Sequence, residues 1–398
     1  MRSRLLLTAV ACALAGALAA PASATATAGA DAPANAVAGH APQAPTDLTV
    51  GDQTRPLSVE GAPVFGWRPR DIDPGEAQSA YQIRVAAGRQ AVWDSGKVAS
   101  SQQSYVPYRG PALAPGESYT WTVRTWDKTG KASPWARPGS FDTGLADADW
   151  QASWIRRTTA EPDDYTLARK EFTVGAGPVV RARVYIAAYQ QYELHVNGRL
   201  VDQGPAFNYP DDGYYKAVDV TRLIAAGRPN AVGAIVHYYG SGQGRPAAQP
   251  GLLARIVVDH ADGTRHVVVT DGSWRVARGP WQTAPRRNGD GRDWVEFIDG
   301  RAEPLGWDRP GFDASSWAAP QVVGTHPAGV FTHLQDQETD LAHRTVRPAK
   351  VTTLPSGSVV ADFGVIIPAI PVVRFRNGES GRVVPMTAGY LLNDDGTV

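Results

Sequence analysis

Two loops concentrate oxygen-bearing side chains that could bind a metal ion. The first contains Asn208, Asp211 and Asp212, and the second, residues 288–296, contains Asp290 and ends at Glu296. Carboxylate, amide and backbone carbonyl oxygens are the ligands that hard cations such as calcium take in proteins. The same residue types are also common in solvated turns without a ligand, so both interpretations stay open at this point.

Aromatic side chains lie in or beside these loops and could supply the flat apolar face on which a sugar ring stacks. The candidates are Tyr209, Tyr214, Tyr215, Tyr238, Tyr239 and Trp294. The whole chain is also rich in aromatic residues, with 12 Trp and 14 Tyr against 2 Met. Sugar-binding proteins often have this composition, although the core of a β-sandwich uses the same residues.

Composition and the N-terminus restrict the class of protein. Lys plus Arg equals Asp plus Glu at 39 each, so no sustained field of one sign attracts nucleic acid. Arg2 and Arg4 precede an uncharged run, and a small-residue site, ASA at residues 22–24, follows it. This pattern predicts a signal peptide over residues 1–24 and a secreted protein without a membrane span. Cys12, the only cysteine, falls inside that peptide; a lipoprotein that keeps it is the alternative.

The remaining chain is predicted to be all-β. Residues 25–44 are nearly all Ala, Pro, Gly and Thr and are expected to be a disordered linker. Residues 45–145 alternate apolar and polar positions between turn signals, which predicts a fibronectin-III-like β-sandwich with Tyr119 and Trp121 in its core. Asp127 lies in the predicted turn DKTG, residues 127–130, after one of its strands.

Two further sandwiches are predicted downstream. Residues 149–325 contain short strands and the hairpin turn Asn197-Gly198, which together favour a jelly-roll domain of the carbohydrate-binding type. His195 is expected on the outward side of its strand. Residues 340–398 are expected to begin a third sandwich, with strands near residues 359–363 and 370–376, that is cut short at Val398.

Several motifs, in this order, resemble the bacterial α-L-rhamnosidases of glycoside hydrolase family 78. They are DWQASWI at 149–155, YELHVNG at 192–198, DVT at 219–221, DFG at 362–364 and DDGT at 394–397. The resemblance implies a fibronectin-like module, a jelly-roll domain and the start of a sandwich that precedes an α/α barrel. Two loops depart from the family pattern, HYYGSGQG at 237–244 and PAFNYPDDG at 205–213.

The resemblance also implies a function. In this family the jelly roll holds a terminal rhamnose with the help of a calcium ion, and the catalytic carboxylates lie on the barrel. We therefore expect a non-catalytic fragment whose partner is a rhamnose-containing glycoside or polysaccharide. The predicted metal ligands are Asn208, Asp211, Asp212 and Asp290, and the predicted sugar contacts are Asn208, Tyr209, Asp211, Asp212, Trp294 and Glu296.

Other interpretations remain open from the sequence. An ion pair between Glu296 and Arg301 is the structural alternative to a role of Glu296 in binding. The chain as a whole could instead be a secreted lectin-like protein or part of a cell-surface adhesion array, because both are built from the same kinds of sandwich. The gene sequence beyond codon 398 would distinguish these classes.

Overall fold

The computed structural model describes residues 39–159, 161–209, 213–241, 248–282, 294–337, 339 and 344–398. Regular structure in these residues consists of strands and two short 3-10 turns, η1 (Asp147–Asp149) and η2 (Gly300–Ala302). The predicted all-β class is confirmed. Among the described segments, no helix has the length and apolar character needed to cross a membrane.

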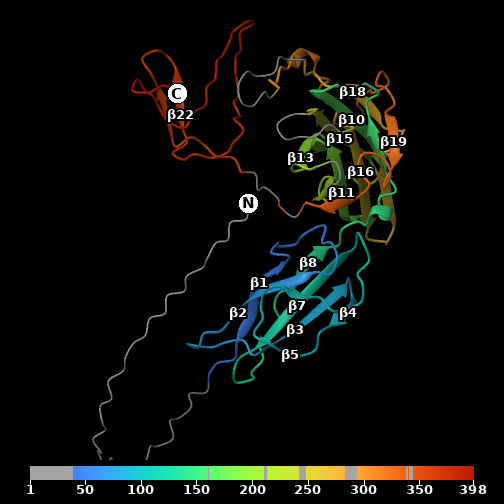
Figure 1. The fold of residues 1–398 in the computed structure, drawn as a ribbon, viewed down its shortest axis with the longest axis vertical. Helices are drawn as coiled ribbons and strands as arrows, with labels where there is room; N and C mark the ends of the chain where they lie inside the picture. Colours follow the sequence, from blue (N-terminus) through green and yellow to red (C-terminus); the bar gives the residue numbers. More distant parts are fainter. Residues whose placement is uncertain are drawn as a thin grey trace, which may run out of the picture. The chain divides into compact units, whose positions relative to one another are not determined.

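The first of two compact units is a β-sandwich that comprises Ala62–Ala112, Tyr119–Ser140 and the described residues up to Arg55. One sheet has the order β1 (Gln43–Val50), β2 (Val64–Arg70), β6 (Val106–Pro107). The other has the order β4 (Gln90–Asp94), β3 (Ala80–Ala87), β7 (Ser118–Trp126), β8 (Gly139–Asp142), and β5 (Val98–Ala99) pairs with β3 (Figure 1).

Alternation along the strands builds the core of this unit. In β7 the side chains of Tyr119, Trp121 and Val123 are buried, as the sequence predicted for the first two, and polar residues between them face outward. Phe65 of β2 meets Trp121 with ring centroids 4.5 Å apart, which joins the two sheets. β1 begins at Gln43, within the last residues of the segment predicted to be a linker.

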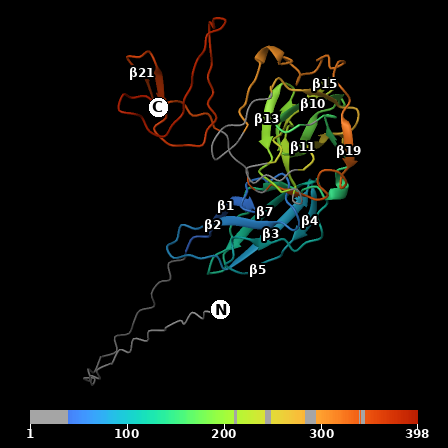
Figure 2. The same cartoon turned by 45° about the horizontal axis from the view of Figure 1, so that its top comes forward.

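The second unit comprises Pro56–Gly61, Leu113–Ser118 and the chain from Phe141 onward. Its five-stranded sheet has the order β13 (Arg199–Gly204), β12 (Gln191–Val196), β15 (Pro229–Tyr238), β10 (Asp164–Thr173), β18 (Arg275–Arg278). The facing sheet has the order β19 (Gln321–Thr325), β9 (Ser153–Arg156), β16 (Gly251–His260), β11 (Val179–Tyr189), β14 (Gly213–Asp219), β20 (Leu334–Asp336), with β17 (Arg265–Val269) on β16. Figure 2 labels β11 and β19 of this sheet and β10, β13 and β15 of the five-stranded sheet.

The two sheets of this unit enclose one apolar core. Residues from β11 and β16 on one side and from β12 and β15 on the other belong to the same buried cluster, which includes Ile186, Leu194, Val232 and Ile256. In β12 the alternate positions Tyr192, Leu194 and Val196 point into this core. The predicted hairpin turn Asn197-Gly198 connects β12 to β13, with φ values of 50° and 81°.

In the five-stranded sheet, the strand register places one terminus of each strand at the same end of the sheet. Asp164 at the start of β10 pairs with Tyr238 at the end of β15, and Tyr192 near the start of β12 pairs with Gly204 at the end of β13. β18 ends at Arg278, which pairs with Thr166. The connections that follow β13, β15 and β18 therefore leave the sheet at the same end.

The C-terminal part contains a single hairpin of β21 (Lys350–Thr353) and β22 (Val359–Asp362). The prediction of a strand at residues 370–376 is wrong: these residues form no strand, and the side chains of Ile370, Val372 and Phe375 are exposed. A strand needs a neighbour for its backbone hydrogen bonds, and among the described residues this segment has none.

Candidate functional site

Three aromatic rings form a continuous stack at the end of the five-stranded sheet where these strand termini lie. Tyr165 of β10 lies between His237 of β15, with ring centroids 4.0 Å apart, and Trp281, with centroids 4.3 Å apart. Both ring pairs are close to parallel, at 7° and 6°. All three residues are partly exposed, so the stack forms part of the surface of the second unit.

Strand pairing explains how the stack forms. Tyr165 and His237 are directly opposite each other on β10 and β15, so their side chains leave the same face of the sheet. Beyond β18, the amide of Gly279 donates to the Tyr165 carbonyl at 2.8 Å, which turns the chain back over that ring. A Cβ atom at Gly279 would lie 2.6 Å from the Trp281 ring, so glycine permits the close approach of the indole.

Carboxylates surround the stack. The indole Nε1 of Trp281 donates to Glu296 Oε1 at 2.7 Å, and His237 Nε2 lies 3.2 Å from Asp163 Oδ1. Burial, with the negative charges of Glu296 and Asp164, raises the pKa of Asp163 to about 6. Burial and the neighbouring carboxylates also raise the pKa of the Tyr165 phenol, which therefore stays neutral. The site thus combines aromatic faces with hydrogen-bond acceptors.

A buried amide fixes the loop that follows β15. Gln190 is 8% exposed, and its Oε1 accepts from the backbone amides of Tyr239 at 2.6 Å and Gly240 at 3.1 Å. Its Nε2 donates to the Gly240 carbonyl at 2.8 Å. The indole of Trp294 donates to the Tyr239 carbonyl at 2.9 Å, which ties the segment after residue 293 to the same loop.

The predicted site residues divide into three groups. Glu296 contacts the aromatic stack by accepting from the Trp281 indole, and Trp294 donates to the Tyr239 carbonyl in the loop after β15. Asn208 and Tyr209 follow β13, at the same end of the sheet, and no contact joins them to the stack within the described residues. The predictions for Asp211, Asp212 and Asp290 lie outside the described residues.

The loop after β13 has two features of its own. Tyr209 and Phe207 are exposed, at 60% and 51%, and their rings meet edge to face with centroids 5.3 Å apart. Asn208 between them is only 5% exposed, and its Nδ2 has no hydrogen-bond partner in the described part of the chain. The loop therefore presents an aromatic surface next to a buried amide with unused hydrogen-bonding capacity.

Several other expectations need correction. Tyr215 is fully buried, and its hydroxyl accepts from the Leu145 amide, so it belongs to the core because its strand position faces inward. His195 lies on the outer face of β12, as predicted, although its side chain is covered there: it is 16% exposed, and Nδ1 lies 2.9 Å from Asp308. Arg301 pairs with Asp299 at 2.7 Å, two residues away, so that Glu296 is free to accept from Trp281.

Sequence reasoning missed Asp163, Tyr165 and Trp281 and used His237 only as part of a divergent motif. Tyr165 lies in a strand, and nothing local marks it as a surface residue. The sequence Gly279-Pro280-Trp281 was the available signal, because a glycine near a strand end can mark a close approach of another group.

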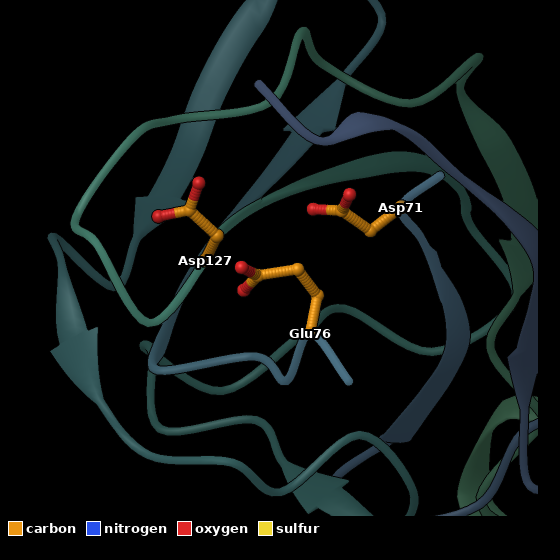
Figure 3. A group of neighbouring side chains, drawn as sticks. All are labelled: Asp71, Glu76 and Asp127. Carbon is orange, nitrogen blue, oxygen red and sulfur yellow. The ribbon is translucent and has the colours of Figure 1, made fainter. Parts of the chain in front are cut away.

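The described residues also contain one cluster of three carboxylates, which the sequence did not suggest. Asp71, Glu76 and Asp127 of the first unit have oxygen atoms within 4.8 Å of one another (Figure 3). Lys128 Nζ lies 3.5 Å from Glu76, and Asp127 accepts from Thr129 Oγ1 at 2.8 Å. These contacts stabilise the turn predicted at residues 127–130, and Lys128 offsets one of the three negative charges.

Asp163 gives the second unit a specific pH dependence. Because its pKa of about 6 lies above the ordinary value of 3.8, the folded protein favours the protonated carboxyl. The associated stabilisation is present at low pH and is lost as pH rises from about 4 to about 6. The charged groups that face it are Glu296, Asp164 and Arg278, with His237 at hydrogen-bond distance.

We expect Asp163→Asn to remove this component. Urea unfolding at several pH values measures the free energy of unfolding of the wild type and the variant. The wild-type value minus the variant value should decrease as pH rises from about 4 to about 6 and stay constant above that. Parallel pH profiles would contradict the assignment of the raised pKa to Asp163.

Comparison with known proteins supplies the family. The model of the "Rha78A-like, N-terminal immunoglobulin domain" matches residues 45–147, and that of the "Alpha-L-rhamnosidase N-terminal domain" matches residues 177–361. An α-L-rhamnosidase of Alteromonas sp. is 30% identical over 88% of this chain and 41% of its own length. One from Streptomyces avermitilis is 26% identical over 86% of this chain and 51% of its own.

A solved structure agrees with these matches. The α-L-rhamnosidase of "Dictyoglumus thermophilum" superimposes with a TM-score of 0.68 at 30% identity, over 81% of this chain and 38% of that protein. The chain therefore spans about two-fifths to half of the length of these relatives. By its two matched domains and their order, the chain belongs to the bacterial α-L-rhamnosidase family, glycoside hydrolase family 78, as the N-terminal region of such a protein.

Proposed function

We propose that this chain is the sugar-binding, non-catalytic part of an exported α-L-rhamnosidase and that its second unit binds terminal L-rhamnose. The observation that carries the proposal is the stack of Trp281, Tyr165 and His237 with carboxylates at its rim. The stack lies at the end of the sheet where three connecting loops leave together.

The chemistry at this end of the sheet suits a neutral sugar. The partly exposed indole of Trp281 ends the stack and offers an apolar surface to the hydrophobic side of a pyranose ring. The exposed carboxylate of Glu296 can accept hydrogen bonds from ring hydroxyls, and its negative charge disfavours an anionic ligand. Family membership makes L-rhamnose the first sugar to test.

Hydrolysis by the whole protein is part of the proposal. The relatives with 41% and 51% of their length covered are named α-L-rhamnosidases. Hydrolysis with inversion requires an acid and a base carboxylate on opposite sides of the scissile bond, with room for a water. We place that pair in the region of the relatives that this chain does not cover, and we assign positioning of the glycoside to the second unit.

A calcium ion in the loop after β13 would fit one observation. Asn208 is buried, and an amide rotated by 180° would direct Oδ1 where Nδ2 now has no partner. Asp211, Asp212 and Asp290 complete the proposed ligand set. The ion would supply a positive charge that hydroxyl oxygens of the sugar can coordinate, and it would also hold the loop in place.

Isothermal titration calorimetry tests both parts. L-Rhamnose titrated into the full chain with calcium should give saturable heat with modest affinity, about millimolar, corresponding to about −4 kcal/mol. Adding a chelator, or replacing Asp211 and Asp212 together by Ala, should weaken binding if calcium takes part. Equal binding in both conditions would remove calcium from the proposal, and absence of heat from folded protein would refute the rhamnose site.

A further inference from the structure

The first unit has a surface cavity that is distinct from the aromatic stack and from the carboxylate cluster. Its volume is about 190 Å³, and it lies on the outer face of the sheet formed by β1, β2 and β6. Its polar and aromatic lining comprises Asp47, Thr49, Asp52, Arg68, Ser104 and Tyr105. The cavity is smaller than the roughly 300–1,000 Å³ typical of drug-sized ligands, so it suits a single ring.

An irregularity in β1 forms the cavity. Thr46 pairs with Arg68 and Thr49 with Gly66, so three residues of β1 advance against two of β2. Asp47 lies at this bulge with a φ of 54°, and a bulge redirects side chains in this way. A Cβ atom at Gly66 would lie 2.5 Å from Thr49 Oγ1, so the glycine leaves room for the floor of the cavity.

Tyr105 forms an aromatic wall that is held in place before any ligand arrives. It is 59% exposed with a φ of 51°, and its hydroxyl donates to the Asp52 carboxylate. The side-chain amide of Gln102 donates to the carbonyls of Ser104 and Tyr105, each at 3.1 Å. Gln78 in turn donates to the Gln102 carbonyl at 2.9 Å. A fixed ring loses little conformational entropy on binding.

The charges at the cavity select against anions. Asp47 and Arg68 are 3.4 Å apart and remain exposed, at 65% and 69% of their side chains. With Asp52, the cavity carries two carboxylates and one guanidinium, a net charge of −1. Carboxylates accept from hydroxyl groups and a guanidinium donates to oxygen, which is the combination that recognises a vicinal diol.

We propose that this cavity binds one neutral pyranose residue, with the ring against Tyr105 and the hydroxyls on Asp47, Asp52 and Arg68. The site is separate from the proposed rhamnose site of the second unit and does not depend on it. A chain with both sites would hold a branched or polymeric glycan at two points, and two weak sites on one chain raise the apparent affinity for such a ligand.

Protein-observed NMR of the full ¹⁵N-labelled chain tests the proposal. The probes are methyl α-L-rhamnopyranoside and methyl β-D-galactopyranoside, and the reporter is the backbone amide of Trp67, a residue of β2 that lines the cavity. We expect a saturable shift of Trp67 with at least one probe. Tyr105→Ala and Arg68→Gln should each weaken the affinity about tenfold or more.

Ile72→Ala is the matched control, because Ile72 is exposed to the same extent as Tyr105, 59%, and does not line the cavity. It should leave the Trp67 titration unchanged. No saturable shift with either probe, or an unchanged affinity in both cavity variants, would overturn the proposal. In a parallel titration, Trp281→Ala should not alter the Trp67 shift, so failure of the rhamnose site and failure of this site are distinguishable.

Discussion

Replacing Trp281 by alanine should weaken L-rhamnose binding about tenfold or more. Trp281 is the outer ring of the stack and the donor to Glu296, so its removal takes away an aromatic surface and frees the carboxylate. Aromatic contacts of this kind contribute about 0.5–1.5 kcal/mol beyond their buried area, and a tenfold change corresponds to about 1.4 kcal/mol. Calorimetric titration of wild type and variant measures the difference.

Two further variants refine this prediction. Trp281→Phe keeps a ring without the donor and should retain part of the affinity. Trp317→Ala serves as the control, since Trp317 is also a partly buried tryptophan of the second unit but packs against Trp307 and Phe312. If Trp281→Ala binds rhamnose as well as the wild type does, the stack is not the sugar platform.

Asp142→Ala is expected to reduce the free energy of unfolding of the second unit by about 3–5 kcal/mol. Asp142 is 4% exposed, and its Oδ2 accepts from Arg183 Nε at 2.8 Å and from Arg181 Nε at 3.2 Å. Its Oδ1 accepts from Ser118 Oγ at 2.6 Å. Both arginines are 8% exposed, and only Asp259 and Asp219 would remain to compensate them, so loss of Asp142 leaves excess positive charge at a buried position.

Urea unfolding at constant pH measures this effect through the transition of the second unit. Asp142→Asn should lie between the wild type and the alanine variant, because it keeps an acceptor but loses the charge. Asp313→Ala removes an exposed carboxylate that accepts from the backbone amide and the side chain of nearby Ser315, and it should change stability by less than about 1 kcal/mol. A similar small effect for Asp142→Ala would show that solvent or other groups compensate the arginines.

The buried arginine network and the aromatic stack lie on different sheets of the second unit. Arg181 also reaches Asp259 at 3.0 Å, and Arg183 reaches Asp219 at 2.9 Å, so these four residues lie on the seven-stranded sheet, whereas Asp142 is the last residue of β8. The aromatic stack lies on the five-stranded sheet. The apolar core between the two sheets stabilises the fold, so the loops at the end of the sheet can carry the proposed binding residues without weakening it.

The sequence by itself determined the class of fold and much of its local structure. Period-2 alternation identified strands such as β7 and β12, and Asn197-Gly198 identified the hairpin turn after β12. Both signals depend on residues that are neighbours along the chain. Ordered motifs indicated the family. Trp294 and Glu296 were also assigned to a binding loop; Glu296 accepts from Trp281 of the aromatic stack, and Trp294 donates to Tyr239 in the loop after β15.

Only the tertiary structure decided how the site is assembled. Tyr165 meets His237 because of the register between β10 and β15, and Trp281 reaches Tyr165 because the chain turns back after β18. The cavity beside Tyr105 likewise depends on a bulge in β1, more than fifty residues earlier in the chain. Register and bulge positions arise from pairing between distant segments and from the packing of a whole core, so no local pattern of residue types contains them.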